Sequence, residues 1–203
     1  RDYHLARQPA RKASVVYVGL CHPDNEVEEI STDGFSQPEE FLERTIILPE
    51  ARAYRSRDLV RGIVGPTPIT VLNYTSSAAA AMLAKLGREM AFDTVQIEGV
   101  HLARYIPVVR KFPGRPPIVC DWHDILSELL RRYSENAPSL SRKFYARRTT
   151  KLLHGIEKQV LHECDIHTAV SRSDEEKLRS QVPSAVFHVV DNGVDTSYYA
   201  EAQ

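Results

Sequence analysis

The sequence predicts an α/β domain in which a parallel sheet is covered by helices on both faces. Two observations carry this prediction. Short runs of β-branched and apolar residues alternate with segments of helical pattern along the whole chain, which is typical of strand-helix-strand units. The expected strands are also apolar throughout rather than at every second position, as in parallel sheets that are buried on both faces.

The expected strands are short, and polar, glycine or proline residues bound them. The first is the β-branched run that ends at Leu20, and the second is stopped by Pro49. Together the expected strands cover residues 14–20, 44–48, 93–98, 117–121, 165–170 and 185–190.

Helical patterns fill most of the intervening segments. They cover residues 1–12, 52–64, 74–90, 100–111, 125–133 and 140–163, and a last helix is expected from residue 173. Ser173 and Glu176 stand three residues apart, as in a capping box at a helix start. The helix over 140–163 is amphipathic. Its apolar side is expected to contain Phe144, Leu152, Leu153, Ile156, Val160 and Leu161.

Composition narrows the class of protein. The 203 residues are 42% hydrophobic and 26% charged, the ordinary range for a globular domain with a buried core. The net charge of -1 gives no overall field that would attract nucleic acid. Cys21, Cys120 and Cys164 stand far apart and form no metal motif, which favours a reducing compartment and a cytoplasmic location. No apolar run approaches the roughly 20 residues of a membrane-spanning helix.

Polar side chains follow four of the expected strands. Parallel sheets place their chemistry at the carboxyl ends of the strands, so these side chains are expected on one rim of the sheet. They are Glu98 with Gly99, His123 with Asp124, Ser171 with Asp174, and Asn192 with Gly193.

Each of these groups also has a structural interpretation. Asn192-Gly193 is suited to a tight turn with positive φ. A serine at the start of the last helix either caps that helix or helps its amides to hold a phosphate or hydroxyl. His123 is either a base or hydroxyl-binding group or a satisfied, non-catalytic histidine. Glu98 is either a surface carboxylate or a ligand group, with Gly99 leaving room beside the backbone.

Two further features suggest ligands. Asp121, His123 and Asp124 are metal-ligand types, but no second cluster completes a site, so no metal is expected. The helix over 140–163 has a basic face that either is solvated or meets membrane phosphates or a diphosphate-linked acceptor. This face contains Arg142, Lys143, Arg147, Arg148 and Lys151. The usual dinucleotide, P-loop and hydrolase-elbow motifs are absent from the sequence.

In chain order, several of these segments resemble the N-terminal domain of family 4 glycosyltransferases. They are FDTVQIE at 92–98, PIVCDWHD at 117–124 with SELLR at 127–131, AVSRSD at 169–174, and VVDNGVD at 189–195. The pairing of the VSxxD junction with an NGVD turn about 20 residues later is the most specific part. Asp191 stands where the family usually has proline, which is similar to a bacterial subgroup linked to exopolysaccharide export.

The resemblance implies a GT-B architecture, in which two Rossmann-like domains face each other across a cleft. Residues 1–195 would be the first of these domains, and 196–203 would begin the interdomain hinge. The donor-binding C-terminal domain and the first strand of the N-terminal domain are expected to be missing from this chain. That strand would have paired between residues 15–20 and 95–98, so the chain alone is expected to be poorly soluble or loosely folded. Because the donor domain and the glycine-rich loop are also expected to be missing, the chain alone is expected to be inactive.

The resemblance also implies a reaction. A hexosyltransferase-type enzyme would transfer a sugar from a UDP- or GDP-linked donor to a saccharide or lipid-linked acceptor, with retention and without a metal. His123 would contact the donor sugar or the reacting hydroxyl, and Glu98 and Asp124 would assist acceptor binding. Substrate contacts would also fall to Gly99, Ser171, Asp174, Asn192 and Gly193. The expected location is cytoplasmic, with peripheral contact at the inner face of the membrane as an alternative.

Two other functions remain open from the sequence. Sugar-nucleotide epimerases share the GT-B fold and would use the same rim carboxylates and histidine as acids and bases. A non-catalytic domain could instead support an active transferase within an exopolysaccharide assembly complex. Free nucleotide that appears only when acceptor is added would exclude the epimerase. The residues of the missing donor domain would distinguish a non-catalytic scaffold from an active transferase.

Overall fold

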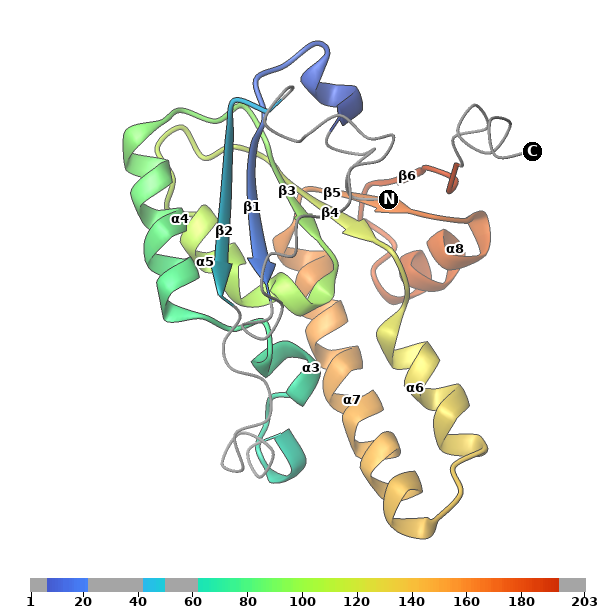
Figure 1. The fold of residues 1–203 in the computed structure, drawn as a ribbon. Coiled ribbons are helices and arrows are strands. Elements are labelled where there is room, and N and C mark those ends of the chain that lie inside the picture. Colours follow the sequence, from blue (N-terminus) through green and yellow to red (C-terminus); the bar gives the residue numbers. More distant parts are fainter. Residues whose placement is uncertain (1–6, 22–41, 50–61, 194–203) are drawn as a thin grey trace, which may run out of the picture. The chain divides into compact units, whose positions relative to one another are not determined.

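The computed structural model describes residues 7–21, 42–49 and 62–193 (Figure 1). The chain divides into two compact units. The first contains Arg1–Arg52 and Asn192–Gln203, and the second contains Ala53–Asp191.

In the first unit, a pair of parallel strands confirms the two strands expected near the N-terminus. β1 (Val16–Cys21) pairs with β2 (Arg44–Pro49), in a register that runs from Val16 opposite Arg44 to Cys21 opposite Pro49. Residues 7–10 are helical and precede β1. The unit therefore begins with the predicted helix-then-strand order.

The second unit is built on a four-stranded parallel sheet in the order β3-β4-β5-β6. Every pair of neighbouring strands is parallel, so the predicted fold class is confirmed. The strands are β3 (Val95–Glu98), β4 (Ile118–Trp122), β5 (Ile166–Ala169) and β6 (Phe187–Val189). Among the described residues, β1-β2 and β3-β6 are separate sheets, and the strand expected between β1 and β3 stays a prediction.

The helices of the second unit follow the predicted alternation. They are α3 (Ile69–Leu72), α4 (Ser77–Glu89), the 3-10 helix η2 (Val100–Tyr105), α5 (Ile106–Val109), α6 (Leu126–Glu135), α7 (Leu140–Glu163) and α8 (Arg172–Gln181). Residues 62–64 are helical, whereas the rest of the helix expected over 52–64 lies outside the described residues. None of the helices in the described ranges has both the length and the apolarity that crossing a bilayer requires.

Three predicted helices differ at their boundaries for local reasons. α4 starts at Ser77 rather than at residue 74, because the Ser76 hydroxyl caps it by accepting from Ala79 N at 3.3 Å. The helix expected over 100–111 is instead 3-10 and then α-helical, with Pro107 in the first turn of α5, where its missing N–H costs least. α8 is capped by Ser171 and not by the Ser173-Glu176 pattern.

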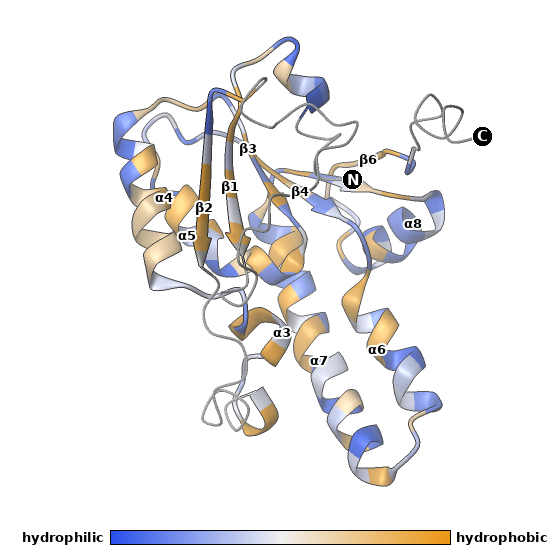
Figure 2. Ribbon diagram, in the orientation of Figure 1, coloured by the Kyte–Doolittle hydropathy of each residue, from blue (hydrophilic) through white to orange (hydrophobic). Residues whose placement is uncertain are grey.

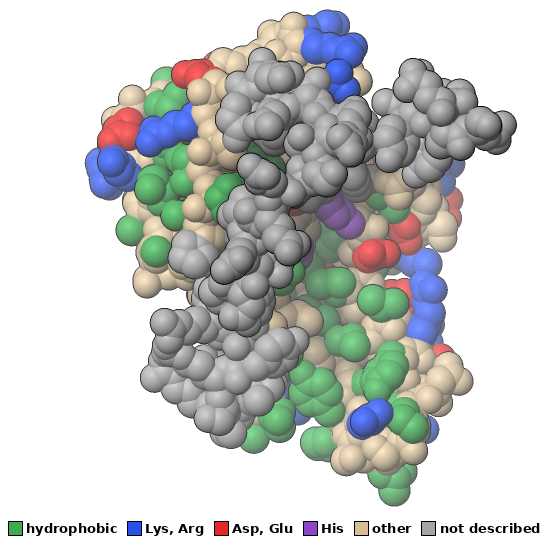
Figure 3. Space-filling model, viewed as in Figure 1, with side chains coloured by type: hydrophobic (Ala, Val, Ile, Leu, Met, Phe, Trp, Pro, Cys, Tyr) green, Lys and Arg blue, Asp and Glu red, His purple; other side chains and the backbone are tan. Residues whose placement is uncertain are grey.

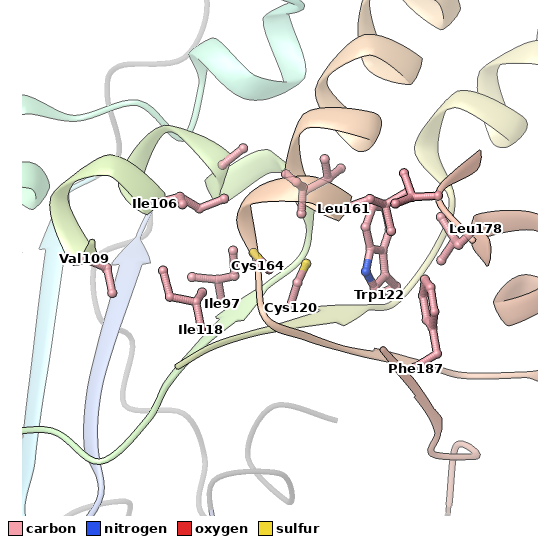
Figure 4. Packing of buried hydrophobic residues seen from close by; sticks show 14 of the residues in the cluster. Ile97, Ile106, Val109, Ile118, Cys120, Trp122, Leu161, Cys164, Leu178 and Phe187 are labelled. Carbon is pink, nitrogen blue, oxygen red and sulfur yellow. The ribbon is translucent and has the colours of Figure 1, made fainter. Parts of the chain in front are cut away.

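The core of the second unit lies between one face of the sheet and the helices packed on it (Figure 4). Along β4, the buried side chains Ile118, Cys120 and Trp122 alternate with Val119 and Asp121, because successive strand residues point to opposite faces. Helix residues such as Leu161 of α7 and Leu178 of α8 pack against these strand residues and complete the core. Side chains that face the core therefore alternate along β4 with side chains that face the other way and include a carboxylate. The sequence had suggested strands that are apolar throughout.

Two buried thiols lie within this core. Cys120 on β4 and Cys164 at the end of α7 are both free, and Figure 4 shows them side by side. Burial, with Cys164 as hydrogen-bond partner, raises the pKa of the Cys120 thiol well above its ordinary value. These cysteines therefore act as small apolar residues of the core.

The helices α6 and α7 form a long hairpin that extends away from the sheet (Figure 1). α7 has 24 residues and is therefore about 36 Å long, and only its C-terminal part packs on the sheet. Val160 and Leu161 belong to the core there. Leu153 is buried outside that cluster, but Phe144 is 73% exposed. The expectation that Phe144 belongs to the buried side is wrong, because this residue lies near the free end of the hairpin. Figure 2 shows the mixed apolar and polar colouring of this end.

Candidate functional site

A row of polar side chains crosses the sheet on the face opposite the core. The register pairs Glu98 of β3 with Asp121 of β4, Asp121 with Thr168 of β5, and Thr168 with His188 of β6. Paired residues of neighbouring strands point to the same side of a sheet. The four side chains therefore lie in one line, although they are up to 90 positions apart in the chain (188 minus 98).

His123 joins this row from the loop that follows β4. Its Nε2 atom lies 2.7 Å from Glu98 Oε2 and 3.2 Å from Asp121 Oδ2. Carboxylate oxygens accept hydrogen bonds, so Nε2 carries the hydrogen that both carboxylates share. The structure thus brings together Glu98 and His123, as expected for residues at the carboxyl ends of neighbouring strands.

Other polar groups fix both carboxylates. The Thr168 hydroxyl donates to Asp121 Oδ1, and Gln96 Nε2 donates to Glu98 Oε1 at 2.5 Å. Asp121 is almost fully buried, with 2% of its side chain exposed, whereas 32% of the His123 side chain is exposed. The imidazole is therefore held by the buried Asp121 carboxylate and is still reachable from solvent.

Burial raises the pKa of Glu98 above its ordinary value. Hydrogen bonds from His123 and Gln96 oppose this change, and the charge of Asp121 adds to it. A partly desolvated carboxyl group beside a second carboxylate is stabilised by a bound proton or by a cationic neighbour. The site is accordingly suited to hold a proton or a positively charged group near His123.

The same three residues are also plausible metal ligands on geometry alone. One ligand atom from each of Glu98, Asp121 and His123 lies within 4.8 Å of the others. An imidazole with two carboxylates is a donor set for several divalent ions. It would have to release the hydrogen bonds that now hold His123, since a metal would take the place of the shared proton.

Gly99 follows Glu98 with a φ of +87°, a region that favours glycine. Its N–H donates to the Asp121 carbonyl at 2.9 Å, which extends the pairing of β3 with β4 past the end of the strand. A Cβ at this position would lie 2.8 Å from Cε1 of the His101 ring. The space expected for a ligand beside Gly99 is therefore filled by His101, whose ring also contacts Tyr74 at 4.2 Å between centroids.

Ser171 and Asp174 hold each other at the start of α8. The Ser171 hydroxyl accepts from Asp174 N at 3.1 Å and donates to Asp174 Oδ2 at 2.7 Å. This is the capping interpretation of the motif, and both side chains are engaged by it. Asp124 is exposed, and within the described part of the chain it makes no hydrogen bond or ion pair.

Asn192 and Gly193 belong to the first unit, and both are exposed. The positive φ expected for an Asn-Gly turn is wrong here, since the described residues with positive φ are Gly99, Gly114 and Arg115. Residues 191–193 instead form irregular backbone without a turn. The rest of the predicted motif, from Val194, lies outside the described residues.

Sequence reasoning missed the supporting residues Thr168 and Gln96, and it considered Asp121 as a carboxylate beside His123 and as a metal-ligand type but did not select it as a site residue. Thr168 sits in the middle of an expected strand, where a threonine is an ordinary β-former. Gln96 has one available signal: it precedes Glu98 by two residues, so both point to the same face.

A family model described as Glycosyltransferase Family 4 matches residues 4–198. A comparison with curated proteins returned no match. The matched region includes β3 and β4 with Glu98, Asp121 and His123. Because this match spans nearly the whole sequence and the fold is the expected parallel α/β, the chain belongs to glycosyltransferase family 4.

Proposed function

We propose that this chain supplies the acceptor side of a retaining glycosyltransferase that uses a nucleotide-sugar donor. Membership of family 4 supports a glycosyltransferase domain. The proposal adds that a second domain of GT-B type binds a UDP- or GDP-linked hexose, and that the sugar goes to a saccharide or lipid-linked acceptor. A role in exopolysaccharide synthesis at the cytoplasmic side of the membrane is the setting that fits these substrates.

The observation that carries the proposal is the position of His123 between two carboxylates. Its Nε2 lies 2.7 Å from Glu98 and 3.2 Å from Asp121 at the carboxyl ends of adjacent parallel strands. Ligands of open parallel sheets bind at these strand ends. The buried carboxylate Asp121 and the hydroxyl of Thr168 fix the ring, so it is prearranged rather than positioned on binding.

In sugar transfer with retention, positive charge develops at the anomeric carbon while the diphosphate departs. A preorganised site lowers the barrier when its groups are already aimed at that charge and at the attacking hydroxyl. The imidazole of His123 would hold the donor sugar or the acceptor hydroxyl. Glu98 and Asp121 would keep the ring oriented and place negative charge close to the developing positive charge.

The test is the substitution His123→Ala in the full-length enzyme. We expect turnover, measured as nucleotide release with acceptor present, to fall by about a hundredfold or more. His162→Ala is the matched control, because His162 is exposed on the last turn of α7. Turnover of the His123 variant within a few-fold of wild type would refute the role of this residue.

Three further measurements in the same assay separate the proposal from its alternatives. Product analysis should show retained anomeric configuration, and inversion would overturn that part. The reaction should proceed in the presence of EDTA; a requirement for added divalent metal would instead favour a cation at Glu98, Asp121 and His123. Sugar interconversion without any acceptor would favour an epimerase. Absence of all turnover in the wild-type enzyme, with donor and acceptor both supplied, would favour the scaffold.

A further inference from the structure

One stripe of α7 is exposed along most of its length. Residues spaced three or four apart share a face of a helix, and six such positions in α7 are all exposed. They are Leu140, Phe144, Arg147, Lys151, His154 and Lys158. The stripe, here called the α7 stripe, begins with two large apolar residues and continues with basic and imidazole side chains.

The apolar part of the stripe lies at the free end of the α6–α7 hairpin. Leu140 is 86% exposed and Phe144 is 73% exposed. On α6, Leu129 and Tyr133 are also exposed and stand one turn apart. Figure 3 shows hydrophobic side chains along the hairpin with Lys and Arg side chains beside them. Large apolar side chains this exposed on one hairpin suggest a binding surface.

On α7, the exposed charge around these residues is positive. Arg142, Arg147, Lys151 and Lys158 are exposed, and within the described residues none of them makes an ion pair. The two carboxylates of α7 are elsewhere, because Glu157 is fully buried and Glu163 is the last residue of the helix. By contrast, the α6 cations Arg131 and Arg132 are paired with Glu128.

One basic residue of the sequence-predicted face does not belong to this surface. Arg148 is half-buried, and its Nη2 donates to the Gly65 carbonyl. Its guanidinium is therefore directed into the protein. The exposed basic residues lie instead on the α7 stripe and at the adjacent position Arg142, whereas Lys143 is half-buried.

We propose that the free end of the α6–α7 hairpin docks on a bilayer that contains anionic lipids. Leu140 and Phe144 would enter the boundary between headgroups and acyl chains, and the nearby cations Arg142, Arg147 and Lys151 would contact lipid phosphates. Apolar residues combined with unpaired cations are the combination that interfacial helices use. A protein partner with a matching apolar patch would leave the excess positive charge uncompensated unless it were also acidic.

The hairpin also sets a distance between the bilayer and the site. α6 begins three residues after His123 and has ten residues, so its far end lies about 15 Å along the helix axis from its start. An acceptor attached to a lipid diphosphate could extend over such a distance. This link to the acceptor rests on the proposed function, whereas docking itself does not.

Vesicle binding tests the docking surface without any catalytic readout. The protein would be floated with phosphatidylcholine vesicles that either contain or lack phosphatidylglycerol. We expect binding to the anionic vesicles that weakens at high salt, and much weaker binding to the neutral ones. Phe144→Ser should weaken binding by about tenfold. Arg147→Gln with Lys151→Gln should weaken it by about fivefold for each charge removed.

Matched controls distinguish binding through this surface from nonspecific adsorption of the protein to vesicles. Val186→Ser changes an exposed apolar residue outside the hairpin. Arg88→Gln with Lys111→Gln removes two exposed charges from other elements. Both controls should bind like wild type, and all variants should keep the wild-type melting temperature because only exposed side chains change.

Three outcomes would overturn the proposal: wild type that ignores anionic vesicles, hairpin variants that bind as wild type does, and controls that weaken binding equally. A change in oligomeric state on Phe144→Ser, with unchanged vesicle binding, would show that a second copy of the chain occupies this surface instead. Turnover on a soluble acceptor reports on His123 separately. Loss of docking with turnover retained would therefore refute this inference and leave the proposed function in place.

Discussion

Acid is expected to destabilise the second unit through one buried histidine, His167 on β5. Its side chain is fully buried, Trp122 Nε1 donates to its Nδ1 at 3.2 Å, and Phe187 packs against the ring. Because Nδ1 accepts, the neutral ring carries its proton on Nε2. Burial lowers the pKa of His167 from 6.5 to about 4. Protonation would also place two donors, Nδ1–H and the Trp122 N–H, opposite each other.

The sign and size of the effect follow from proton linkage. The unfolded chain binds a proton at His167 near pH 6.5, whereas the folded chain binds it only near pH 4. The contribution of this group is therefore fully present above pH 6.5, and it is lost as the pH falls from 6.5 towards 4. A pKa difference of this size corresponds to about 3 kcal/mol of unfolding free energy, with a slope of at most about 1.4 kcal/mol per pH unit.

Urea unfolding across this pH range would measure the contribution. His167→Phe keeps a ring in the core but cannot bind a proton, so its stability should fall less steeply with acid than that of wild type. The variant is expected to be less stable at neutral pH, because the Trp122 N–H loses its acceptor. His188→Ala, at an exposed position on β6, should keep the wild-type slope. An equal pH dependence in wild type and His167→Phe would refute the reasoning.

Two further predictions concern buried polar contacts. Glu157 of α7 accepts from the N–H of Ser127 at 2.8 Å and from its hydroxyl. Glu157→Ala should therefore lower the unfolding free energy, measured by urea denaturation, by about 3 kcal/mol. Glu163→Ala is the control, and equal losses of unfolding free energy in the two variants would contradict the prediction. The Thr168 hydroxyl donates to Asp121, so Thr168→Val should lower kcat by about ten- to a hundredfold through a less well-placed His123. Thr168→Ser should restore kcat, and a kcat that does not differ between these two variants would argue against positioning.

Where the local patterns of the sequence were strong, they predicted the helices and strands well. The helix expected over 140–163 is α7 with the same bounds, because Ser139 caps its start and its apolar spacing continues to its end. The start of α8 was placed too late, since two serines, Ser171 and Ser173, both offer a cap and only the surrounding backbone selects one.

The candidate site could be predicted only in part. Glu98 and His123 were accessible because each follows an apolar strand. The role of Asp121 and Thr168 depends on register, which pairs residues 47 positions apart in the chain (168 minus 121), and no local spacing contains that information. The exposure of Phe144 was likewise missed, because an amphipathic pattern does not tell where the partner surface of a long helix ends.

The buried carboxylate of Glu157 has a mechanical consequence. It joins the first turn of α6 to the C-terminal third of α7 through buried hydrogen bonds, so neither helix can slide along the other without breaking hydrogen bonds that water cannot replace. Relative sliding of the two helices is therefore opposed at this contact. Since α6 begins three residues after His123, the same contact fixes the long hairpin to the segment of backbone that carries the imidazole.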